Sequence, residues 1–275
     1  MTKVGELVGR GRTSDVYAYG ADSVIKVAHD DVPKDWPAFE AELTAAVWEL
    51  GVAAPQVRDV VDVNGRPSVV FERIPGPSMW QQMIDDPKRV PVLARELASI
   101  QKTLLQIGIP PRIPDFVDRL VRKIQLAHGL TSDERSEAVA LAGALPRGAA
   151  LLHGDLHPGN VLMGPNGPIV IDWFDAAIGH PIADVVRSSI LIQPGGRDAP
   201  RHLPKATAAL LQVAHGAYLS EFRTELERAS GDLARWLGVV AAGRLAEDAE
   251  HDAGALIELW SVRADEAEAA RLLFS

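Results

Sequence analysis

The stretch LLHGDLHPGNVLMGPNGPIVID, residues 151–172, indicates the fold of this chain more specifically than any other segment. An apolar run at each end flanks a polar segment that contains Asp155 and Asn160. Glycine and proline within that segment favour a tight, fixed turn of the backbone. Asp172 directly follows the second apolar run. The pattern predicts two short buried strands that bring two carboxylates and one amide into one pocket.

The oxygen atoms of these side chains suggest a metal-dependent reaction. Carboxylate and amide oxygens suit a divalent cation such as Mg²⁺, and one carboxylate would then remain to accept a proton. Zn²⁺ held by His153, Asp155 and His157 is a weaker alternative, because a zinc site of this kind needs a further ligand in close register. A hydrolase with a serine nucleophile is not indicated, since the sequence has no G-x-S-x-G motif.

Residues 153–160, His-Gly-Asp-Leu-His-Pro-Gly-Asn, and residues 171–173, Ile-Asp-Trp, resemble two motifs of the aminoglycoside phosphotransferase family. That family belongs to the protein-kinase-like superfamily and has choline kinases as relatives. The His-Gly-Asp stands where protein kinases carry His-Arg-Asp, and the asparagine follows at their spacing; the Ile-Asp-Trp stands where they carry Asp-Phe-Gly. The resemblance implies that Asp155 is the catalytic residue and that Asn160 and Asp172 bind the metal.

The N-terminal part predicts three short strands, over residues 4–8, 16–19 and 23–27. The first two are joined by Gly-Arg-Gly-Arg-Thr-Ser, whose backbone N–H groups could approach phosphate oxygens. Two glycines spaced in this way usually mark an ordinary hairpin. The resemblance implies a loop that covers the phosphates, with a serine in place of the third glycine of the kinase pattern. The residues assigned to that loop are Gly9, Gly11 and Ser14.

Lys26 lies between Ile25 and Val27 and would therefore point to the opposite face of its strand. A solvated lysine on a polar strand face is the ordinary interpretation. The resemblance instead implies a lysine that binds the α and β phosphates of a nucleotide and pairs with a glutamate on the following helix. Glu40 is assigned as that partner, with Glu42 as the alternative.

A helix is predicted over residues 35–50, with Asp35 as a candidate N-cap and Gly51 at its end. Its apolar stripe consists of Phe39, Leu43, Val47 and Leu50. A hairpin follows, with strands over residues 57–63 and 68–74 and the turn Asn-Gly between them.

Pro-Gly-Pro after this hairpin breaks regular structure and predicts a boundary between a β-rich N-lobe, residues 1–74, and a larger C-lobe, residues 75–275. The resemblance implies a hinge at this boundary. Its backbone from Glu72 to Ile74 would bind the edge of the adenine, and Phe71 would lie behind that base.

The larger lobe is predicted to be mostly helical. Helices are expected over residues 78–85, 90–107, 116–128 and 131–145, and again over 205–275 with breaks near Gly231 and Gly254. The helix after residue 131 begins with a capping-box pattern, Thr-Ser-Asp-Glu. Asp184 begins an apolar helix as a candidate N-cap or first-turn residue, and the resemblance implies that it also binds the backbone of the catalytic loop. Gln101 stands where relatives often carry a histidine.

Residues 221–252 hold eight acidic residues against four arginines, a net charge of −4. An acidic cluster near their end consists of Glu247, Asp248, Glu250 and Asp252, together with His251. A solvated helix face is the ordinary interpretation. The alternative is an acidic surface that receives a polycationic substrate.

The composition limits which binding partners and which cellular location are expected. A net charge of −9 argues against nucleic acid as the main partner, because phosphate backbones bind basic surfaces. The chain has no cysteine, which excludes disulfides and zinc–thiolate sites and fits a reducing compartment. It has neither the apolar core of a signal peptide nor an apolar run approaching ~18 residues. We therefore expect no contact with a membrane and a cytoplasmic location.

Together, motifs and resemblance predict an α+β fold of the bilobal protein-kinase-like type, with a five-stranded antiparallel sheet and one helix in the N-lobe. The predicted reaction transfers the γ-phosphate of ATP, with GTP as the alternative, to a hydroxyl of a small cationic molecule, with Mg²⁺ as cofactor. By resemblance the acceptor is an aminoglycoside or a similar amino-sugar. The alternatives are a small alcohol such as choline, homoserine or a sugar, and another antibiotic class.

Two non-enzymatic functions, a nucleotide-binding pseudokinase and a scaffold protein, are less favoured. A pseudokinase typically lacks the base, a metal ligand or the strand lysine, and all of these are present here. The kinase prediction requires Lys26, Asp155, Asn160 and Asp172 to meet around one triphosphate.

Overall fold

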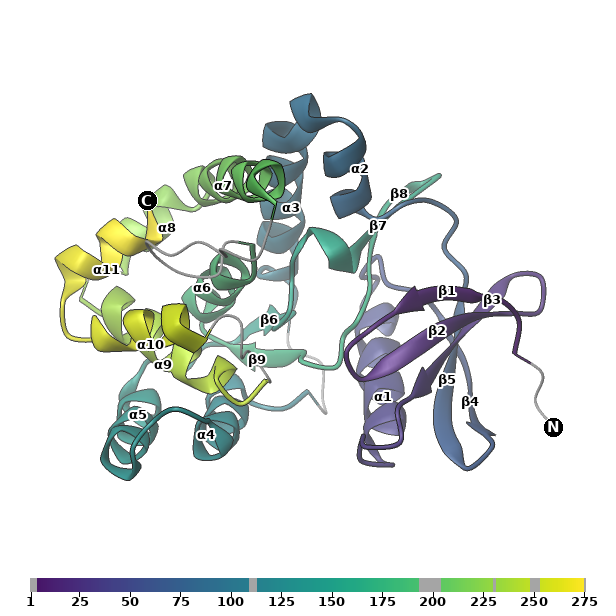
Figure 1. Cartoon of the computed structure of the whole chain (residues 1–275), viewed down its shortest axis with the longest axis horizontal. Coiled ribbons are helices and arrows are strands. Elements are labelled where there is room, and N and C mark those ends of the chain that lie inside the picture. The colour runs from purple at the N-terminus through teal and green to yellow at the C-terminus, as the bar shows by residue number, and fades with distance from the viewer. Residues whose placement is uncertain (1–3, 109–112, 193–203, 230, 248–252, 275) are drawn as a thin grey trace. The chain divides into compact units, whose positions relative to one another are not determined.

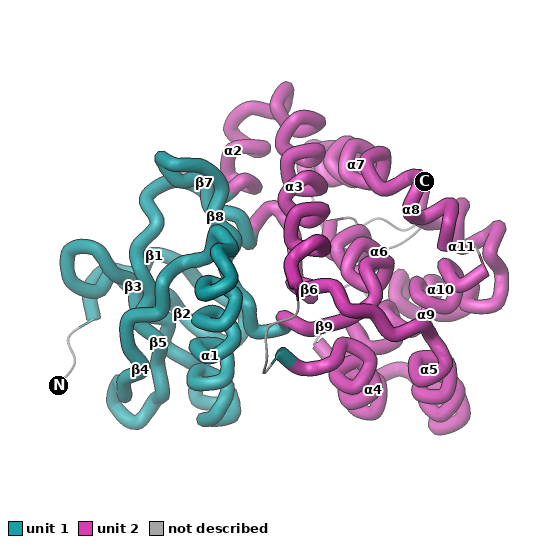
Figure 2. The backbone as a smooth tube through the Cα atoms, turned by 180° about the vertical axis from the view of Figure 1, so that it is seen from behind, with its two compact units in different colours: residues 1–78, 110–113, 160–175 teal, residues 79–109, 114–159, 176–275 magenta. Residues whose placement is uncertain are grey.

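A computed structural model describes residues 4–108, 113–192, 204–229, 231–247 and 253–274. The chain forms two compact units (Figure 2). Unit 1 comprises residues 1–78, 110–113 and 160–175, and unit 2 comprises residues 79–109, 114–159 and 176–275. The predicted α+β, kinase-like fold is confirmed, with an antiparallel sheet in the N-terminal part and a mainly helical C-terminal part. The lobe boundary after residue 74 stays a prediction; unit 1 also takes in a later segment, residues 160–175.

The sheet of unit 1 has five antiparallel strands in the order β1-β2-β3-β5-β4 (Figure 1). These strands are β1 (Leu7–Arg10), β2 (Ser14–Tyr19), β3 (Ser23–Ala28), β4 (Val57–Val63) and β5 (Arg66–Glu72). The first strand begins three residues later than the sequence predicts and continues through Gly9. As a result, only residues 11–13 are left to form the glycine-containing turn.

Side-chain alternation and turn geometry explain the central strands. Ile25 and Val27 are buried in one apolar cluster with residues of β4 and β5, so Lys26 faces the other side of the sheet. The predicted Asn64-Gly65 turn joins β4 to β5, and both residues have a positive φ, 55° and 85°. Asparagine and glycine are the residues that tolerate this conformation in a two-residue hairpin.

Helix α1 (Trp36–Glu49) packs on the sheet, where its Ala41 joins Val69 and Phe71 in a second apolar cluster. Asp35 occupies the N-cap position, but its side chain makes no capping hydrogen bond. The predicted apolar stripe is wrong at Leu50, which is 39% exposed because the helix ends one residue before it.

A two-stranded ribbon, β7 (Val161–Gly164) and β8 (Gly167–Val170), also belongs to unit 1. The N–H of Met163 donates to the carbonyl of Pro77 at 2.9 Å, and the N–H of Val170 donates to the carbonyl of Ala53 at 2.8 Å. Gly76 permits this approach, since a Cβ there would overlap the carbonyl of Met163. The ribbon is thereby held against the segments that flank β4 and β5.

Unit 2 contains the remaining helices and a short antiparallel pair, β6 (Ala150–Leu152) with β9 (Ala177–Gly179). Its helices are α2 (Met79–Asp85), α3 (Val90–Leu104), α4 (Phe116–Leu126), α5 (Ser132–Ala144), α6 (Pro181–Ile192), α7 (Lys205–Ser220), α8 (Arg223–Arg228), α9 (Leu233–Arg244), α10 (Ala253–Ser261) and α11 (Glu266–Leu273), with a short 3-10 turn at Pro87–Arg89. A second 3-10 turn, Pro158–Asn160, begins in unit 2 and ends with the first residue of the unit 1 segment 160–175. Helices α6 and α9 form its centre, since almost all their residues are buried.

Several local predictions for this unit can be checked. The capping box that opens α5 is confirmed, with Thr131 and Glu134 bonded reciprocally. The break near Gly231 is confirmed, because that glycine separates α8 from α9 with a φ of 106°. The predicted break near Gly254 is also present, since α9 ends at Arg244 and α10 begins at Ala253; Gly254 itself is the second residue of α10. No helix in the described part of the chain is long and apolar enough to cross a membrane.

One buried pair in unit 2 predicts a pH dependence of stability. Ser189 on α6 lies 2.7 Å, Oγ to Nε2, from His215 on α7, and burial lowers the pKa of His215 from its ordinary 6.5 to about 4. Between these two pKa values His215 is protonated in the unfolded chain but neutral in the folded chain. The free energy of unfolding therefore falls as the pH drops from 6.5 toward 4. This pKa difference corresponds to a loss of roughly 3 kcal/mol in the free energy of unfolding.

Chemical unfolding across this pH range measures the effect. The slope of unfolding free energy against pH should flatten in His215→Gln, whereas His128→Gln, which alters an exposed histidine of the same unit, should keep the wild-type slope. Equal slopes in wild type and His215→Gln would show that other groups cause the acid sensitivity.

Candidate active site

Lys26 is the centre of a three-residue ion cluster in unit 1. Its Nζ donates to Oε1 of Glu40 on α1 at 2.7 Å and to Oδ1 of Asp172 at 3.1 Å. Glu42, the alternative partner considered from the sequence, is exposed on the same helix. Residues far apart in the sequence therefore meet at one cation. Asp172 remains partly exposed, so the cluster is open to solvent on the side of that carboxylate.

The charge state of the cluster follows from its burial. Burial alone would lower the pKa of Lys26, but Glu40 and Asp172 outweigh it and raise the pKa above the ordinary lysine value, so the ammonium stays charged. Burial raises the pKa of Glu40, and the negative charge of Asp172 acts in the same direction against the pull of Lys26. Lys26 is thus a fixed positive charge held between two carboxylates.

Asp172 and Asn160 are neighbours at one end of the β7–β8 ribbon. Val161 pairs with Val170, and the N–H of Ile171 donates to the carbonyl of Asn160 at 2.9 Å. Asp172 has a φ of 64°, a left-handed conformation that is uncommon for residues other than glycine and is often found at functional sites.

The residues after Asp172 hold the segment in place. The indole Nε1 of Trp173, which is fully buried, donates to the carbonyl of Val170 at 2.9 Å. Phe174 packs against α1, with its ring centroid 4.7 Å from that of Trp36 and 5.8 Å from that of Phe39. The chain directly after Asp172 is therefore held in place by two packed aromatic residues.

Asn160 and Asp172 suit a Mg²⁺ ion that takes its other ligands from phosphate and water. They do not suit a metal site in which the protein supplies every ligand. Within the described residues, no group of three or more histidine, cysteine, aspartate or glutamate side chains could hold a metal. One carboxylate and one amide from adjacent strand ends are hard oxygen donors, and Mg²⁺ typically takes one or two such ligands, with the rest from phosphate and water. The donor set suits a cation that arrives with a phosphorylated substrate.

The predicted phosphate loop is a tight turn between β1 and β2. The N–H of Gly11 donates to the carbonyl of Ser14 at 2.8 Å, and a Cβ on Gly11 would lie 3.0 Å from that oxygen. The carbonyl of Thr13 accepts from the N–H of His29 at 2.9 Å. Ser14 is buried at the start of β2, and Gly9 lies within β1. Of the assigned residues, Gly11 therefore shapes the turn itself.

The predicted hinge lies at the end of β5, where two of its backbone donors are already used. The N–H of Glu72 donates to the carbonyl of Gln56 at 2.9 Å, and the N–H of Arg73 donates to that of Asp22 at 3.0 Å. Phe71 is buried in the apolar cluster with α1. Among the described bonds, the N–H of Ile74 is the donor of this stretch that remains available.

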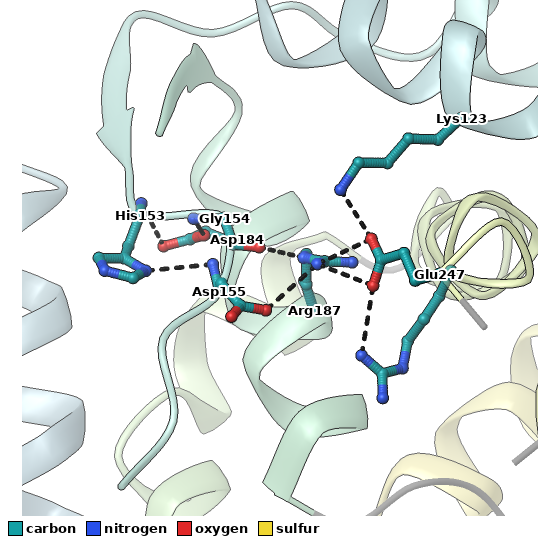
Figure 3. Close-up of polar contacts among 8 residues, drawn as sticks. Lys123, His153, Gly154, Asp155, Asp184, Arg187 and Glu247 are labelled. Carbon is teal, nitrogen blue, oxygen red and sulfur yellow. Dashed lines mark hydrogen bonds and ion pairs between the residues drawn. The ribbon is translucent and has the colours of Figure 1, made fainter. Parts of the chain in front are cut away.

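Asp155 belongs to unit 2, in a loop that several hydrogen bonds fix (Figure 3). Its N–H donates to Nδ1 of His153 at 3.1 Å. Gly154 adopts a φ of 76°, which a side chain would strain. The buried carboxylate of Asp184 accepts from the N–H of His153 at 3.3 Å and from the N–H of Gly154 at 2.8 Å. Asp184 thus binds the loop backbone, the role that the resemblance implies for it.

A family model reports what this set of residues resembles. The model of the phosphotransferase enzyme family (APH) matches residues 4–206. The chain belongs to this family. The match includes both unit 1 and the loop that carries Asp155, and the family resemblance read from the sequence is confirmed. No curated protein sequence matches the chain.

Solved structures of low sequence identity share the fold. A thermostable mutant of aminoglycoside phosphotransferase APH(4)-Ia in apo form has a TM-score of 0.67 at 15% identity, with 96% of each chain covered. Amicoumacin kinase hAmiN, in complex with AMP-PNP, Ca²⁺ and Ami, has a TM-score of 0.59 at 16% identity, over 96% of this chain and 87% of that chain. A choline/ethanolamine kinase family protein from Mesorhizobium loti has a TM-score of 0.54 at 17% identity, over 97% and 92%.

Gln101 is a residue of this phosphotransferase-family chain to which sequence reasoning gave no role. It is fully buried on α3, and its Nε2 donates to Asp184 at 2.8 Å and to Ser188 at 3.1 Å. Its Oε1 accepts from the hydroxyl of Tyr218, a residue whose pKa is raised well above the ordinary value by burial and then by the charge of Asp184. Gln101 therefore supports the carboxylate that supports the loop.

Replacing Gln101 by leucine should destabilise the protein by about 1–3 kcal/mol, because Tyr218 and Asp184 each lose a buried hydrogen-bond partner. Equilibrium urea unfolding at constant slope measures the loss. The double variant Gln101→Leu/Tyr218→Phe should be less destabilised than the sum of the single variants, because the stranded hydroxyl is gone. A loss below about 0.5 kcal/mol would contradict the account, since surface substitutions are of that size.

Arg187 and Glu247 were also missed as parts of the site. No local motif marks Arg187, which lies in the apolar helix α6, three residues after Asp184. Glu247 was assigned to an acidic surface cluster, and both interpretations of that cluster are wrong for this residue, because its side chain is 8% exposed and is paired with cations. The other members of the cluster, residues 248, 250, 251 and 252, lie outside the described residues.

Proposed function

We propose that the chain is an ATP-dependent O-phosphotransferase that acts on a hydroxyl of a small molecule. The observation that carries the proposal is the contact of Lys26 with both Glu40 and Asp172, because a lysine so held is the group that neutralises nucleotide phosphates in kinase-like enzymes. The bound AMP-PNP in hAmiN, which shares the fold, supports a nucleotide as the donor.

Each assigned residue has one task in this reaction. Lys26, positioned by Glu40, binds the α and β phosphates, and the turn at Gly9, Gly11 and Ser14 covers them. Asn160 and Asp172 would hold Mg²⁺, which supplies charge neutralisation on the phosphates. The backbone at Glu72 and Ile74 would bind the adenine or guanine edge. With the N–H groups of Glu72 and Arg73 bonded elsewhere, Ile74 N–H is the donor assigned to the base.

Asp155 completes the mechanism by orienting the acceptor. Its carboxylate accepts the proton of the acceptor hydroxyl while that oxygen bonds to the γ-phosphorus and the bond from phosphorus to the leaving nucleoside diphosphate breaks. The products are the phosphate ester and ADP. That Lys26, Asp155, Asn160 and Asp172 converge on one triphosphate stays a prediction.

For the acceptor, we propose an aminoglycoside or a similar amino-sugar. The net charge of −9 favours a cationic substrate, and APH(4)-Ia, which shares the fold, is an aminoglycoside phosphotransferase. The alternative is a small alcohol such as choline, homoserine or a sugar. The similar fold of the choline/ethanolamine kinase family protein from Mesorhizobium loti supports including such alcohols among the acceptors to be assayed. The proposed setting is the cytoplasm.

A nucleotide-consumption screen tests the function and the acceptor together. Purified protein with Mg²⁺ and either ATP or GTP is assayed with panels of aminoglycosides, amino alcohols and sugars, and phosphorylated products are identified by mass spectrometry. An aminoglycoside that raises turnover above the acceptor-free rate supports the proposal. Stimulation by another panel alone replaces the acceptor but keeps the reaction. No stimulation and no hydrolysis with either nucleotide would reject the phosphotransferase function.

A further inference from the structure

Helix α6 holds the loop of Asp155 at two points, one turn apart (Figure 3). Asp184 accepts the N–H of Gly154 at 2.8 Å, and Arg187, three residues later, donates through Nε to the carbonyl of Gly154. Both backbone polar groups of this glycine are therefore bound by one helix. The same guanidinium reaches Asp155, with NH2 3.3 Å from Oδ1. Arg187 thus contacts the side chain of the assigned catalytic residue as well as the backbone beside it.

Arg187 is itself held by a buried carboxylate. Its side chain is 6% exposed, and its NH2 lies 3.0 Å from Oε1 and 3.2 Å from Oε2 of Glu247. Lys123 on α4 donates to Glu247 at 2.6 Å, and NH1 of Arg244 on α9 lies 3.5 Å from it. Three helices, α4, α6 and α9, thereby supply cations to one carboxylate just after the end of α9.

The stability of unit 2 does not by itself explain why a buried arginine lies at this position. A backbone carbonyl needs only a neutral donor, and burial of an ion pair gives little net stability compared with apolar packing. Here a buried cation spans from Glu247 to Asp155, whose side chain is 28% exposed. The planar guanidinium offers several donors in a fixed fork, which allows it to hold a carbonyl and two carboxylates at once.

We propose that Arg187, held by Glu247, is a positioning residue that fixes the carboxylate of Asp155 for the acceptor hydroxyl. The inference rests on the proposed function, in which Asp155 accepts the proton. Arg187 fixes the orientation of the Asp155 side chain through Oδ1 and fixes its backbone through Gly154. Glu247 fixes Arg187 and balances its charge, so the segment just after α9 contributes to the geometry of the catalytic loop.

Four single variants test this role: Arg187→Met, Arg187→Lys and Glu247→Gln, with Glu137→Gln as the matched control. Glu137 forms a two-bond contact with Arg263 in the same unit, at 2.8 and 2.7 Å, and has no contact with the loop among the described bonds. Steady-state hydrolysis of ATP gives kcat and KM without knowledge of the acceptor, because water takes the phosphoryl group. Hydrogen exchange of the peptide spanning residues 151–157 reports the order of the loop without any turnover.

The expected result is a loss of kcat with little change in KM for ATP. Arg187→Met should lower kcat up to about 100-fold, the effect of a misplaced catalytic group, and KM should stay within about twofold. Arg187→Lys should recover part of the loss, since a single ammonium restores the charge but not the fork. Glu247→Gln should fall between, and both Arg187→Met and Glu247→Gln should speed exchange in residues 151–157. Glu137→Gln should match the wild type in all three readouts.

Other outcomes separate this inference from the proposed function. If Arg187→Met or Glu247→Gln lowers the melting temperature but keeps wild-type kcat and loop exchange, the residues are structural and the inference fails, while the phosphotransferase function stands. If Arg187→Met does not fold, Arg187→Lys and Glu247→Gln decide by the same criteria. If the wild type turns over no nucleotide, the proposed function fails and takes the catalytic role of Asp155 with it.

Discussion

Replacing Asp155 by asparagine is expected to lower the rate of phosphoryl transfer by about 10²–10⁴-fold, the usual contribution of a general base. The amide keeps the size and the hydrogen-bonding reach of the carboxylate but cannot accept the proton of the acceptor hydroxyl. Because Asp155 is not part of the Lys26 cluster that is proposed to bind the phosphates, KM for ATP should change little. The expected signature is a fall in kcat with nucleotide binding preserved.

Rapid quench of a single turnover measures the chemical step, and titration calorimetry with a non-hydrolysable ATP analogue measures binding. Asp133→Asn, a change of the same kind at an exposed position of α5, serves as the control. Near-wild-type turnover in Asp155→Asn would remove Asp155 from the mechanism. Loss of nucleotide affinity together with turnover would instead indicate that Asp155 acts on the nucleotide, and the assignment of roles would change.

The sequence predicted the parts of the site that are written as local motifs. Gly154 and the turn Asn64-Gly65 adopt a positive φ, which few other residues tolerate. Their backbone geometry could therefore be predicted from residue type. Asp155, Asn160 and Asp172 were identified by their spacing around short apolar strands. Such patterns depend on neighbours in the chain, and the structure contains both predicted strands, β6 and β8, although β8 is only partly buried. The strand between them, β7, was not predicted.

The parts that the sequence did not show depend on contacts across long stretches of chain. Gln101 lies on the buried face of the amphipathic helix α3, and Arg187 lies in the apolar helix α6; in either place a polar residue gives no sign of its partner. Gln101 meets Asp184 across 83 positions, and Arg187 meets Glu247 across 60. Glu247 was misjudged for the same reason: an acidic run suggests a solvated face, and only the fold reveals that cations from α4, α6 and α9 surround this carboxylate.

Replacing Lys26 by methionine is expected to lower kcat/KM for ATP by about 10²–10³-fold, the usual effect of removing one preorganised donor from a developing charge. Methionine retains the apolar stem of the lysine, so packing against the sheet is largely conserved. Lys34→Met removes the same charge from an exposed position of unit 1 and should leave kcat/KM unchanged. An unchanged kcat/KM for ATP in Lys26→Met would dismiss this lysine as a phosphate ligand.

The same substitution should make folding stability depend on pH through Glu40. Burial and Asp172 already raise the pKa of Glu40, and Lys26 is the group that opposes them, so its removal raises that pKa further. A carboxyl whose pKa is higher in the folded state stabilises the fold at low pH and loses that contribution as the pH rises through the raised pKa. Lys26→Met should therefore be relatively most stable in mild acid and weaken toward neutral pH.

In urea unfolding at about pH 5 and about pH 8, the double variant Lys26→Met/Glu40→Gln should lose this dependence, because an amide has no proton to release. If single and double variants respond alike to pH, Glu40 is not the group that Lys26 neutralises.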